Sequence, residues 1–182
     1  MGLTLGVASA KVGHEVYFVD INVNTVAKLN HRISTFYEAG LQESLDSLFS
    51  NRQEIAFTNM AELFKANKIN SAIYVISLGT PLGPDSKALL GPVEDVTREV
   101  AGYMTDQDLI ILRSTVAVGT SRHLIEHIPA ITNLSFCPER TIEGKALEEL
   151  STLPQIISGN SSKAEDIAQS YFGTITSSVI KA

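Results

Sequence analysis

The sequence predicts a doubly wound α/β fold built on a mainly parallel sheet. Short apolar runs alternate with segments whose apolar residues recur at helical spacing. The runs are nearly continuous rather than alternating, which is typical of strands buried on both faces. The connections are short, and the chain shows neither repeats nor low-complexity linkers, so we expect one domain over residues 1–182.

The first part of the chain is expected to begin with a helix over residues 2–12. Leu3 and Val7 share one side of it, and Gly13 would end it. Residues 15–20 form an apolar run that ends in an acid, as in a buried parallel strand. By the same criteria, helices are expected over residues 21–32, 41–49 and 60–66, and a strand over residues 55–57. In the helix over residues 41–49, Leu48 and Phe49 are both expected to face inward.

The strongest strand signal lies over residues 72–77, which run into a loop rich in glycine and proline at 78–85. Ser161 or Ser162 is expected to cap the last helix. The tail, residues 174–182, fits a strand or the start of a further segment. The other expected strands cover residues 109–113, 134–136 and 155–159, and the other expected helices cover residues 93–104, 120–127 and 162–172.

The composition is that of an ordinary globular domain, with 44% hydrophobic and 19% charged residues. The net charge of −6 offers no attraction to nucleic acid or to an anionic membrane. No apolar run approaches the roughly 20 residues needed to cross a bilayer. One cysteine allows no internal disulfide, and the N-terminus lacks a basic secretory start, so we expect a cytoplasmic protein.

Polar residues gather where the predicted strands end. Asp20, Thr80, Ser114-Thr115 and Glu139 each follow an expected strand. Ligands of open α/β sheets bind beyond the carboxyl ends of the strands, so these residues predict a ligand site there. His123 and His127 have the spacing of metal ligands on a helix, but no third ligand lies nearby in the sequence, so we expect a solvated helix face and no metal.

Asp20 fits the second half of a dinucleotide-binding fingerprint. The full pattern is strand, G-x-G-x-x-G, helix, strand and then an acid that bonds the ribose. Gly2 would be its third glycine, at a helix start beside the pyrophosphate. The alternative interpretation makes Asp20 a turn or helix-capping residue before Asn22.

The first strand and first two glycines of that pattern would lie before Met1. In the strand order 3-2-1-4-5-6 the first strand is central, so a Rossmann-like sheet lacking it has two unpaired strand edges. We expect either a fragment or a mis-started reading frame, or a gap that is filled by rearrangement, swapping or a partner. We also expect weak or absent dinucleotide binding by this chain.

Taken in order, the motifs resemble the NAD-binding domain of the UDP-glucose/GDP-mannose dehydrogenase family. The C-P-E-R and G-K-A-L motifs are most similar to those of the UDP-N-acetylglucosamine and UDP-N-acetylmannosamine 6-dehydrogenases. The matching signatures are Gly2-Leu3-x-Leu5, Gly13-His14-Glu15-Val16 running to Asp20, Glu38-x-Gly40-Leu41, Thr80-Pro81-Leu82, Ser114-Thr115-Val116 with Gly119-Thr120, and Cys137-Pro138-Glu139-Arg140 with Glu143-Gly144-Lys145-Ala146-Leu147.

The resemblance implies an enzyme that oxidises the C6 alcohol of a UDP-sugar to a carboxylate with two NAD, for surface polysaccharide precursors. It implies Thr115 and Glu139 as catalytic residues, because alcohol oxidation needs a base or an ordered water to take the hydroxyl proton. It implies substrate contacts from residues 140–147. The implied cofactor-binding residues are Gly2, Asp20, Lys28, Thr80, Thr115 and Glu143, and the implied substrate-binding residues are Glu139, Arg140 and Lys145.

Plainer interpretations exist for the central residues. Glu139 could cap a helix or pair with Arg140 or Lys145. Ser114-Thr115 could be an ordinary helix cap, and Thr80 an ordinary turn residue before a proline. Two other functions also fit the chain: a 3-hydroxyacid or 6-phosphogluconate-type dehydrogenase domain, and a non-catalytic α/β binding module.

The chain departs from the family in three respects. The family's nucleophilic cysteine lies in a later domain, so Cys137 is not expected to be the nucleophile. The central dimerising helix and the UDP-binding domain have no counterpart here. Ala117-Val118 replaces the usual proline-containing pair. We therefore expect a truncated domain that is inactive alone and belongs to a homodimeric enzyme.

Overall fold

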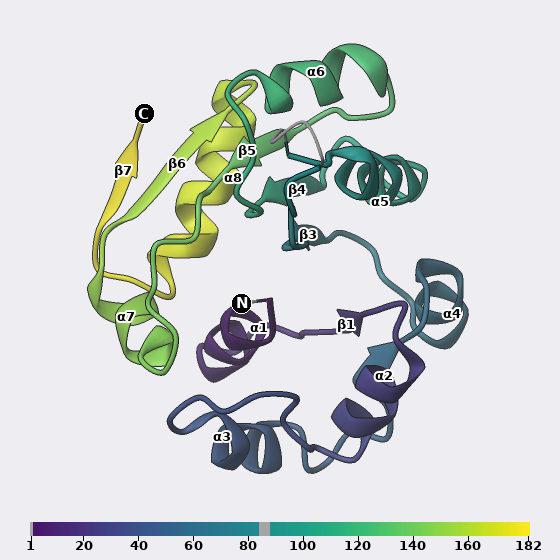
Figure 1. Ribbon diagram of the computed structural model, residues 1–182, viewed down its shortest axis with the longest axis vertical. Coiled ribbons are helices and arrows are strands. Elements are labelled where there is room, and N and C mark those ends of the chain that lie inside the picture. The colour runs from purple at the N-terminus through teal and green to yellow at the C-terminus, as the bar shows by residue number, and fades with distance from the viewer. Residues whose placement is uncertain (1, 84–87) are drawn as a thin grey trace. The chain divides into compact units, whose positions relative to one another are not determined.

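The computed structural model describes residues 2–83 and 88–182 (Figure 1). Packing divides the chain into two compact units. Unit 1 comprises Met1–Ile69, Thr141–Leu153 and Thr174–Ser177, and unit 2 comprises Asn70–Arg140, Pro154–Gly173 and Ser178–Ala182. Residues 84 and 85 of the loop expected at 78–85 lie outside the described part of the chain.

Unit 1 contains a parallel two-stranded sheet in which Phe18 lies opposite Ala56. Its core is formed by α1, α2 and α3 together with β2, and Leu147 packs against it. The elements are α1 (Gly2–Lys11), β1 (Phe18–Val19), α2 (Val23–Asn30), α3 (Leu41–Leu48), β2 (Ala56–Phe57), α4 (Met60–Ala66) and α7 (Ala146–Thr152).

Unit 2 contains a five-stranded sheet in the order β3-β4-β5-β6-β7, parallel except for the antiparallel pair β5–β6. Every residue of β4 is buried, and α8 lies along the sheet, as Figure 1 shows. The elements are β3 (Ile73–Ile76), α5 (Gly91–Ala101), β4 (Leu109–Leu112), α6 (Thr120–His127), β5 (Leu134–Phe136), β6 (Gln155–Gly159), α8 (Ser162–Gly173) and β7 (Val179–Lys181).

The predicted α/β fold with a mainly parallel sheet is confirmed, and so is the expected interruption of the sheet. In the described ranges, 2–83 and 88–182, the two sheets are not hydrogen-bonded to each other. Within the described residues, β1 pairs only with β2, and β3 pairs only with β4.

Two local expectations were wrong, and one helix was missed. The strand expected over residues 15–20 covers only Phe18–Val19. The Val16 carbonyl before it accepts a hydrogen bond from Arg52 Nη1 (2.6 Å) and not from a neighbouring strand. Leu48 does not face inward but is 36% exposed, since α3 ends there and Phe49 fills the core position. Helix α7 was not expected at all, although acidic residues in its first turn are a recognised helix-start signal.

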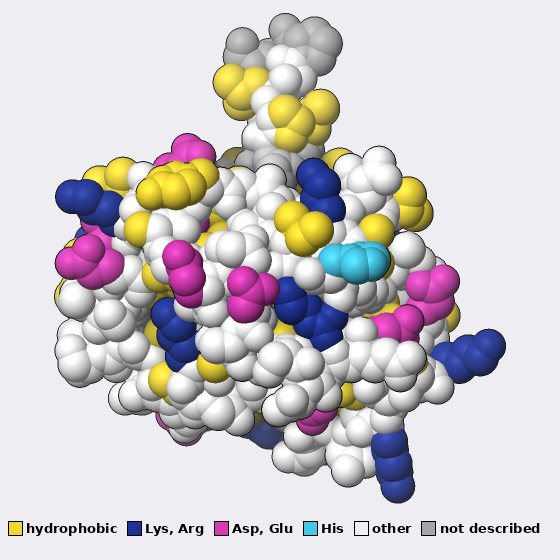
Figure 2. Space-filling view, turned by 90° about the horizontal axis from the view of Figure 1, so that it is seen from below, with side chains coloured by type: hydrophobic (Ala, Val, Ile, Leu, Met, Phe, Trp, Pro, Cys, Tyr) yellow, Lys and Arg dark blue, Asp and Glu magenta, His cyan; other side chains and the backbone are white. Residues whose placement is uncertain are grey.

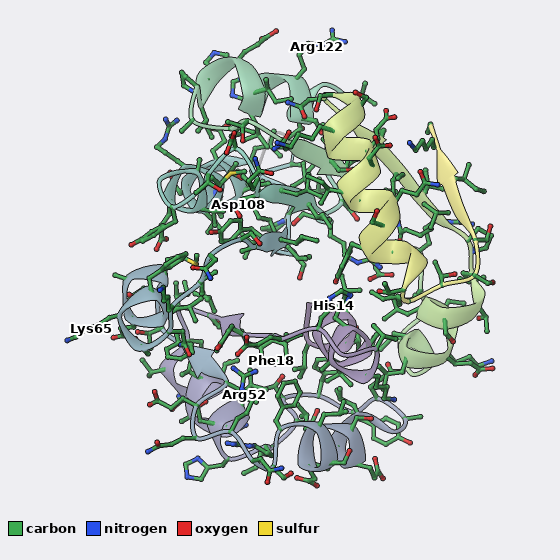
Figure 3. The ribbon with its side chains drawn as sticks, turned by 180° about the vertical axis from the view of Figure 1, so that it is seen from behind. His14, Phe18, Arg52, Lys65, Asp108 and Arg122 are labelled. Carbon is green, nitrogen blue, oxygen red and sulfur yellow. The ribbon has the colours of Figure 1, made fainter. Side chains whose placement is uncertain are left out.

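A glycine contact explains how α1 approaches the sheet of unit 1. A Cβ at Gly6 would lie 2.4 Å from Phe18 Cε1, so only glycine allows this approach. Figure 3 shows Phe18 beside the helix. The Phe18 ring meets Phe49 edge-on at 5.9 Å between centroids. Close helix–strand packing is a role that glycine also plays in dinucleotide-binding folds.

The surface carries charges of both signs. Figure 2 shows lysine, arginine, aspartate and glutamate side chains interspersed over one face. Among the described residues, no helix is both long enough and apolar enough to span a membrane.

Candidate functional site

The loops after β3 and β4 are tied together by a predicted site residue. Thr80 Oγ1 donates a hydrogen bond to the carbonyl oxygen of Thr115 at 2.6 Å. Buried Ser114 reinforces the link, because its Oγ accepts from the Leu78 amide at 2.8 Å. The structure therefore brings Thr80 and Thr115 together, as the sequence predicted, at the carboxyl ends of two adjacent parallel strands.

The helix-cap interpretation of Ser114-Thr115 is wrong. Helix α6 begins at Thr120, and its N-cap is Gly119, whose φ of 93° is left-handed. Glycine adopts that conformation without strain. Thr115 thus stands outside the helix with an exposed side chain.

Glu139 follows β5, and its side chain is 8% exposed. Its partner is Arg113 at the end of β4, with Nε at 2.9 Å and Nη2 at 2.8 Å from Oε2. The pairing expected with Arg140 or Lys145 was wrong. Arg140 gives Glu139 Oε1 only its backbone N–H at 3.0 Å, and its guanidinium donates to the Pro154 carbonyl.

The two predicted catalytic residues follow neighbouring parallel strands. Leu112 of β4 lies opposite Phe136 of the parallel strand β5. Thr115 and Glu139 each stand three residues beyond those paired residues. A hydroxyl and a carboxylate therefore lie in the loops that follow the carboxyl ends of neighbouring strands, where α/β sheets bind ligands.

In unit 1, Asp20 directly follows β1 and is exposed. Its Oδ1 accepts from the Asn22 amide at 2.8 Å, so one carboxylate oxygen does make the turn that the plainer interpretation expected. The helix-cap role belongs instead to Asn22, whose Oδ1 accepts from Asn24 and Thr25.

These residues fit a dinucleotide. Gly2 is the first residue of α1, whose first turn carries no acidic side chain, so its amides and dipole favour an anion such as a pyrophosphate. Asp20 offers a solvent-facing carboxylate of the kind that bonds ribose hydroxyls. Lys28 lies in the last turn of α2, about 9 Å along the helix axis from the turn at Asp20. The structure does not bring Lys28 to that carboxylate.

The motif over residues 135–147 divides between the units after Arg140. In unit 1, Glu143 and Lys145 are exposed on a turn whose Gly144 has a left-handed φ of 87°. Buried Glu38 anchors that turn, because its Oε2 accepts from the Gly144 amide at 2.8 Å. Sequence reasoning treated Glu38 only as part of a signature and missed this contact.

The model of the NAD binding domain of the UDP-glucose/GDP-mannose dehydrogenase family matches residues 1–176. The chain belongs to this family. The resemblance predicted from its motifs is therefore confirmed, and NAD is the cofactor of the domain.

Among curated relatives in the family, a UDP-glucose 6-dehydrogenase of Rickettsia prowazekii is 30% identical over 170 residues, covering 91% of this chain and 38% of that protein. A UDP-N-acetyl-D-mannosamine dehydrogenase of Pyrococcus horikoshii is 27% identical over 180 residues, covering 94% and 42%. The chain thus spans about two fifths of the length of the curated relatives it matches.

Solved structures show the same fold. The UDP-N-acetyl-mannosamine dehydrogenase Cap5O of Staphylococcus aureus superposes with a TM-score of 0.85 at 26% identity, covering 100% of this chain and 45% of that one. Enzymes named for glucose and for N-acetylmannosamine resemble the chain to a similar degree. The preference for an N-acetylhexosamine therefore stays a prediction.

The two helix histidines of this family member have other partners. His123 Nε2 lies 3.1 Å from Glu94 Oε1, and the rings of His123 and His127 are 4.1 Å apart. In the part of the chain that the structure describes, no group of three or more His, Cys, Asp or Glu residues could hold a metal ion.

Cys137 lies at the start of the C-P-E-R motif and is fully buried. Burial raises the pKa of its thiol to about 11, although the hydrogen bond with Ser135 and the charge of Arg113 act in the opposite direction. The thiolate is the nucleophilic form of cysteine, and at pH 8 it amounts to about one part in a thousand here. This agrees with the expectation that Cys137 is not a nucleophile.

We expect the folded chain to resist alkylation at Cys137. With the pKa raised to about 11, the rate with iodoacetamide should stay low and rise about tenfold per pH unit through pH 9 without levelling off, because the thiolate fraction keeps growing until the pH approaches that pKa. The same chain in concentrated urea, followed by mass spectrometry, is the control and should react as an ordinary thiol. Fast modification of the folded chain near pH 7 would contradict the buried, protonated state.

Proposed function

We propose that this chain is the cofactor-binding part of a nucleotide-sugar 6-dehydrogenase that converts the C6 alcohol of a UDP-sugar to the carboxylate. The observation that carries the proposal is that Thr115 and Glu139 each stand three residues beyond Leu112 and Phe136, which pair in the neighbouring parallel strands β4 and β5. The bond from Thr80 to Thr115 supports it further. Family membership supports the cofactor and the coarse reaction class.

In this proposal the bound NAD supplies the hydride acceptor, and the residues of the chain handle binding and protons. The Thr115 hydroxyl holds a water near the reacting carbon, and Glu139 receives the proton that the alcohol loses. Asp20 and Gly2 hold the adenosine half of NAD. Thr80 positions the loop that carries Thr115.

The finer assignment of the substrate rests on the residues of the C-P-E-R and G-K-A-L motifs. We infer a UDP-N-acetylhexosamine, used for surface polysaccharide precursors, with Glu143 toward the cofactor and Arg140 and Lys145 toward the sugar nucleotide. Both basic side chains are exposed and thus accessible to an anionic ligand. A cytoplasmic location and a homodimeric full-length enzyme belong to the same proposal. The chain alone is expected to be inactive, since buried Cys137 does not supply a nucleophile.

The test replaces both Thr115 and Glu139 with alanine in the full-length dehydrogenase. Sugar-acid formation should fall about 10²-fold, the lower range for loss of a positioned general base. The matched control is Thr132→Ala with Glu126→Ala, two exposed residues of unit 2, which should retain activity. Normal sugar-acid production by the Thr115/Glu139 variant would favour a non-catalytic binding module instead.

A further inference from the structure

The least expected charged group in unit 2 is Arg113 at the end of β4. Its side chain is 1% exposed, which makes it one of the largest fully buried side chains. A buried guanidinium is costly unless its charge and its N–H groups are all matched. The sequence offered no sign of it, because Arg113 reads there as the last residue of an apolar strand.

The contacts of Arg113 join three strands of one sheet. Nε and Nη2 both donate to Glu139 Oε2, at 2.9 Å and 2.8 Å. Nη1 donates to the Cys137 carbonyl at 3.3 Å and to Gln155 Oε1 at 3.0 Å. The guanidinium carbon also lies 5.6 Å from the centre of the Phe172 ring. The group is therefore fixed on several sides by the segment after β5, by β6 and by α8.

This geometry fixes the Glu139 carboxylate. Nε and Nη2 of Arg113 both donate to the same oxygen, Oε2, while Oε1 accepts from the Arg140 amide. Rotation of the carboxylate would break these bonds within a site from which water is nearly excluded, since the side chain is 8% exposed. The orientation of Oε1 is thus set by a residue that does not itself reach the surface.

We propose that Arg113 is the positioning residue for Glu139, holding its carboxylate in the orientation that accepts the proton. This inference rests on the proposed function, because it assumes that Glu139 does proton chemistry. The planar fork of arginine is required for the role. A lysine keeps the charge, but as a point charge it cannot reproduce contacts to Glu139, Cys137 and Gln155 together.

The experiment compares Arg113→Lys with its parent in the full-length dehydrogenase. We expect kcat to fall about 10-fold to 100-fold while KM for NAD changes less than about threefold, as for a misplaced catalytic group. In a Glu139→Gln background the same substitution should cause no further loss, because Arg113 acts through Glu139. Arg98→Lys, the same change at an exposed site on α5, is the control and should keep parental kinetics.

Two results would overturn the inference: an unchanged kcat for Arg113→Lys, or an equal loss in the Glu139→Gln background, which would mark a purely structural role. If Arg113→Lys does not fold, Gln155→Met releases one guanidinium bond without removing charge and should lower kcat about threefold, again only when Glu139 is present. An unaltered kcat there contradicts the inference equally. A parent enzyme without 6-dehydrogenase activity would overturn the proposed function and this inference with it.

Discussion

Replacing Asp108 with alanine is expected to lower the free energy of unfolding of unit 2 by about 3 to 5 kcal/mol. The carboxylate is buried just before β4, where Figure 3 labels it. Oδ1 accepts from the Ala72 amide at 2.6 Å, and Oδ2 accepts from the Thr105 amide at 2.7 Å and its hydroxyl at 3.0 Å. Alanine would remove the acceptor of all three donors, of which the Ala72 amide belongs to a half-buried residue.

The loss should be large because Asp108 joins the beginnings of two neighbouring strands. Ala72 directly precedes β3, which pairs with β4 from Ile73 opposite Leu109 onward. Hydrogen bonds to a charged group contribute about 1.5 to 3 kcal/mol each, and an unsatisfied buried amide adds its own desolvation cost. The same two strands carry the Thr80 and Thr115 loops at their far ends.

Urea unfolding of the chain, followed by circular dichroism, measures the effect. Asp106→Ala is the matched control, since that side chain is exposed two residues away and its loss should cost less than about 0.5 kcal/mol. The free energy of unfolding of Asp108→Asn should lie between those of the two alanine variants, because the amide keeps one acceptor oxygen. An Asp108→Ala stability within about 1 kcal/mol of the parent would show that the three bonds contribute little.

Local sequence patterns predicted the bounds of those strands and helices whose structure is determined by their own residues. The strands at residues 134–136 and 155–159 and the helix at 120–127 were predicted with their observed bounds. These segments combine a clear apolar period with glycine or proline at their ends. The direction of β6 was not predicted, because an apolar run reads the same in a parallel and an antiparallel strand.

The partners of buried charges could not be predicted from the sequence. Arg113 and Glu139 are 26 residues apart, and Glu38 meets Gly144 across 106 residues. Sequence reasoning assigned Glu139 the cations nearest to it in the chain, Arg140 and Lys145. The fold instead selects a cation that follows the adjacent strand, because a buried carboxylate needs charge or hydrogen-bond partners buried with it.

A second substitution with a large expected effect, Phe49→Ala, tests whether the chain unfolds as one domain. Phe49 is 2% exposed in the core of unit 1, and its ring packs edge-on against Phe18. Truncating a buried phenylalanine costs about 3 to 5 kcal/mol through lost burial and a residual cavity. Unit 1 should therefore lose most of its stability, because a domain of this size has only about 5 to 15 kcal/mol in total.

Hydrogen exchange locates that loss. The two sheets share no hydrogen bonds, so we expect faster exchange in α1, α2 and α3 while the amides of Leu109–Leu112 in β4 keep parental protection. Asp108→Ala should give the reverse pattern. Leu48→Ala is the control in unit 1, because this neighbouring side chain is already 36% exposed. Uniformly faster exchange in both units for Phe49→Ala would instead mean that the chain unfolds as one cooperative domain, as its unbroken sequence pattern predicts.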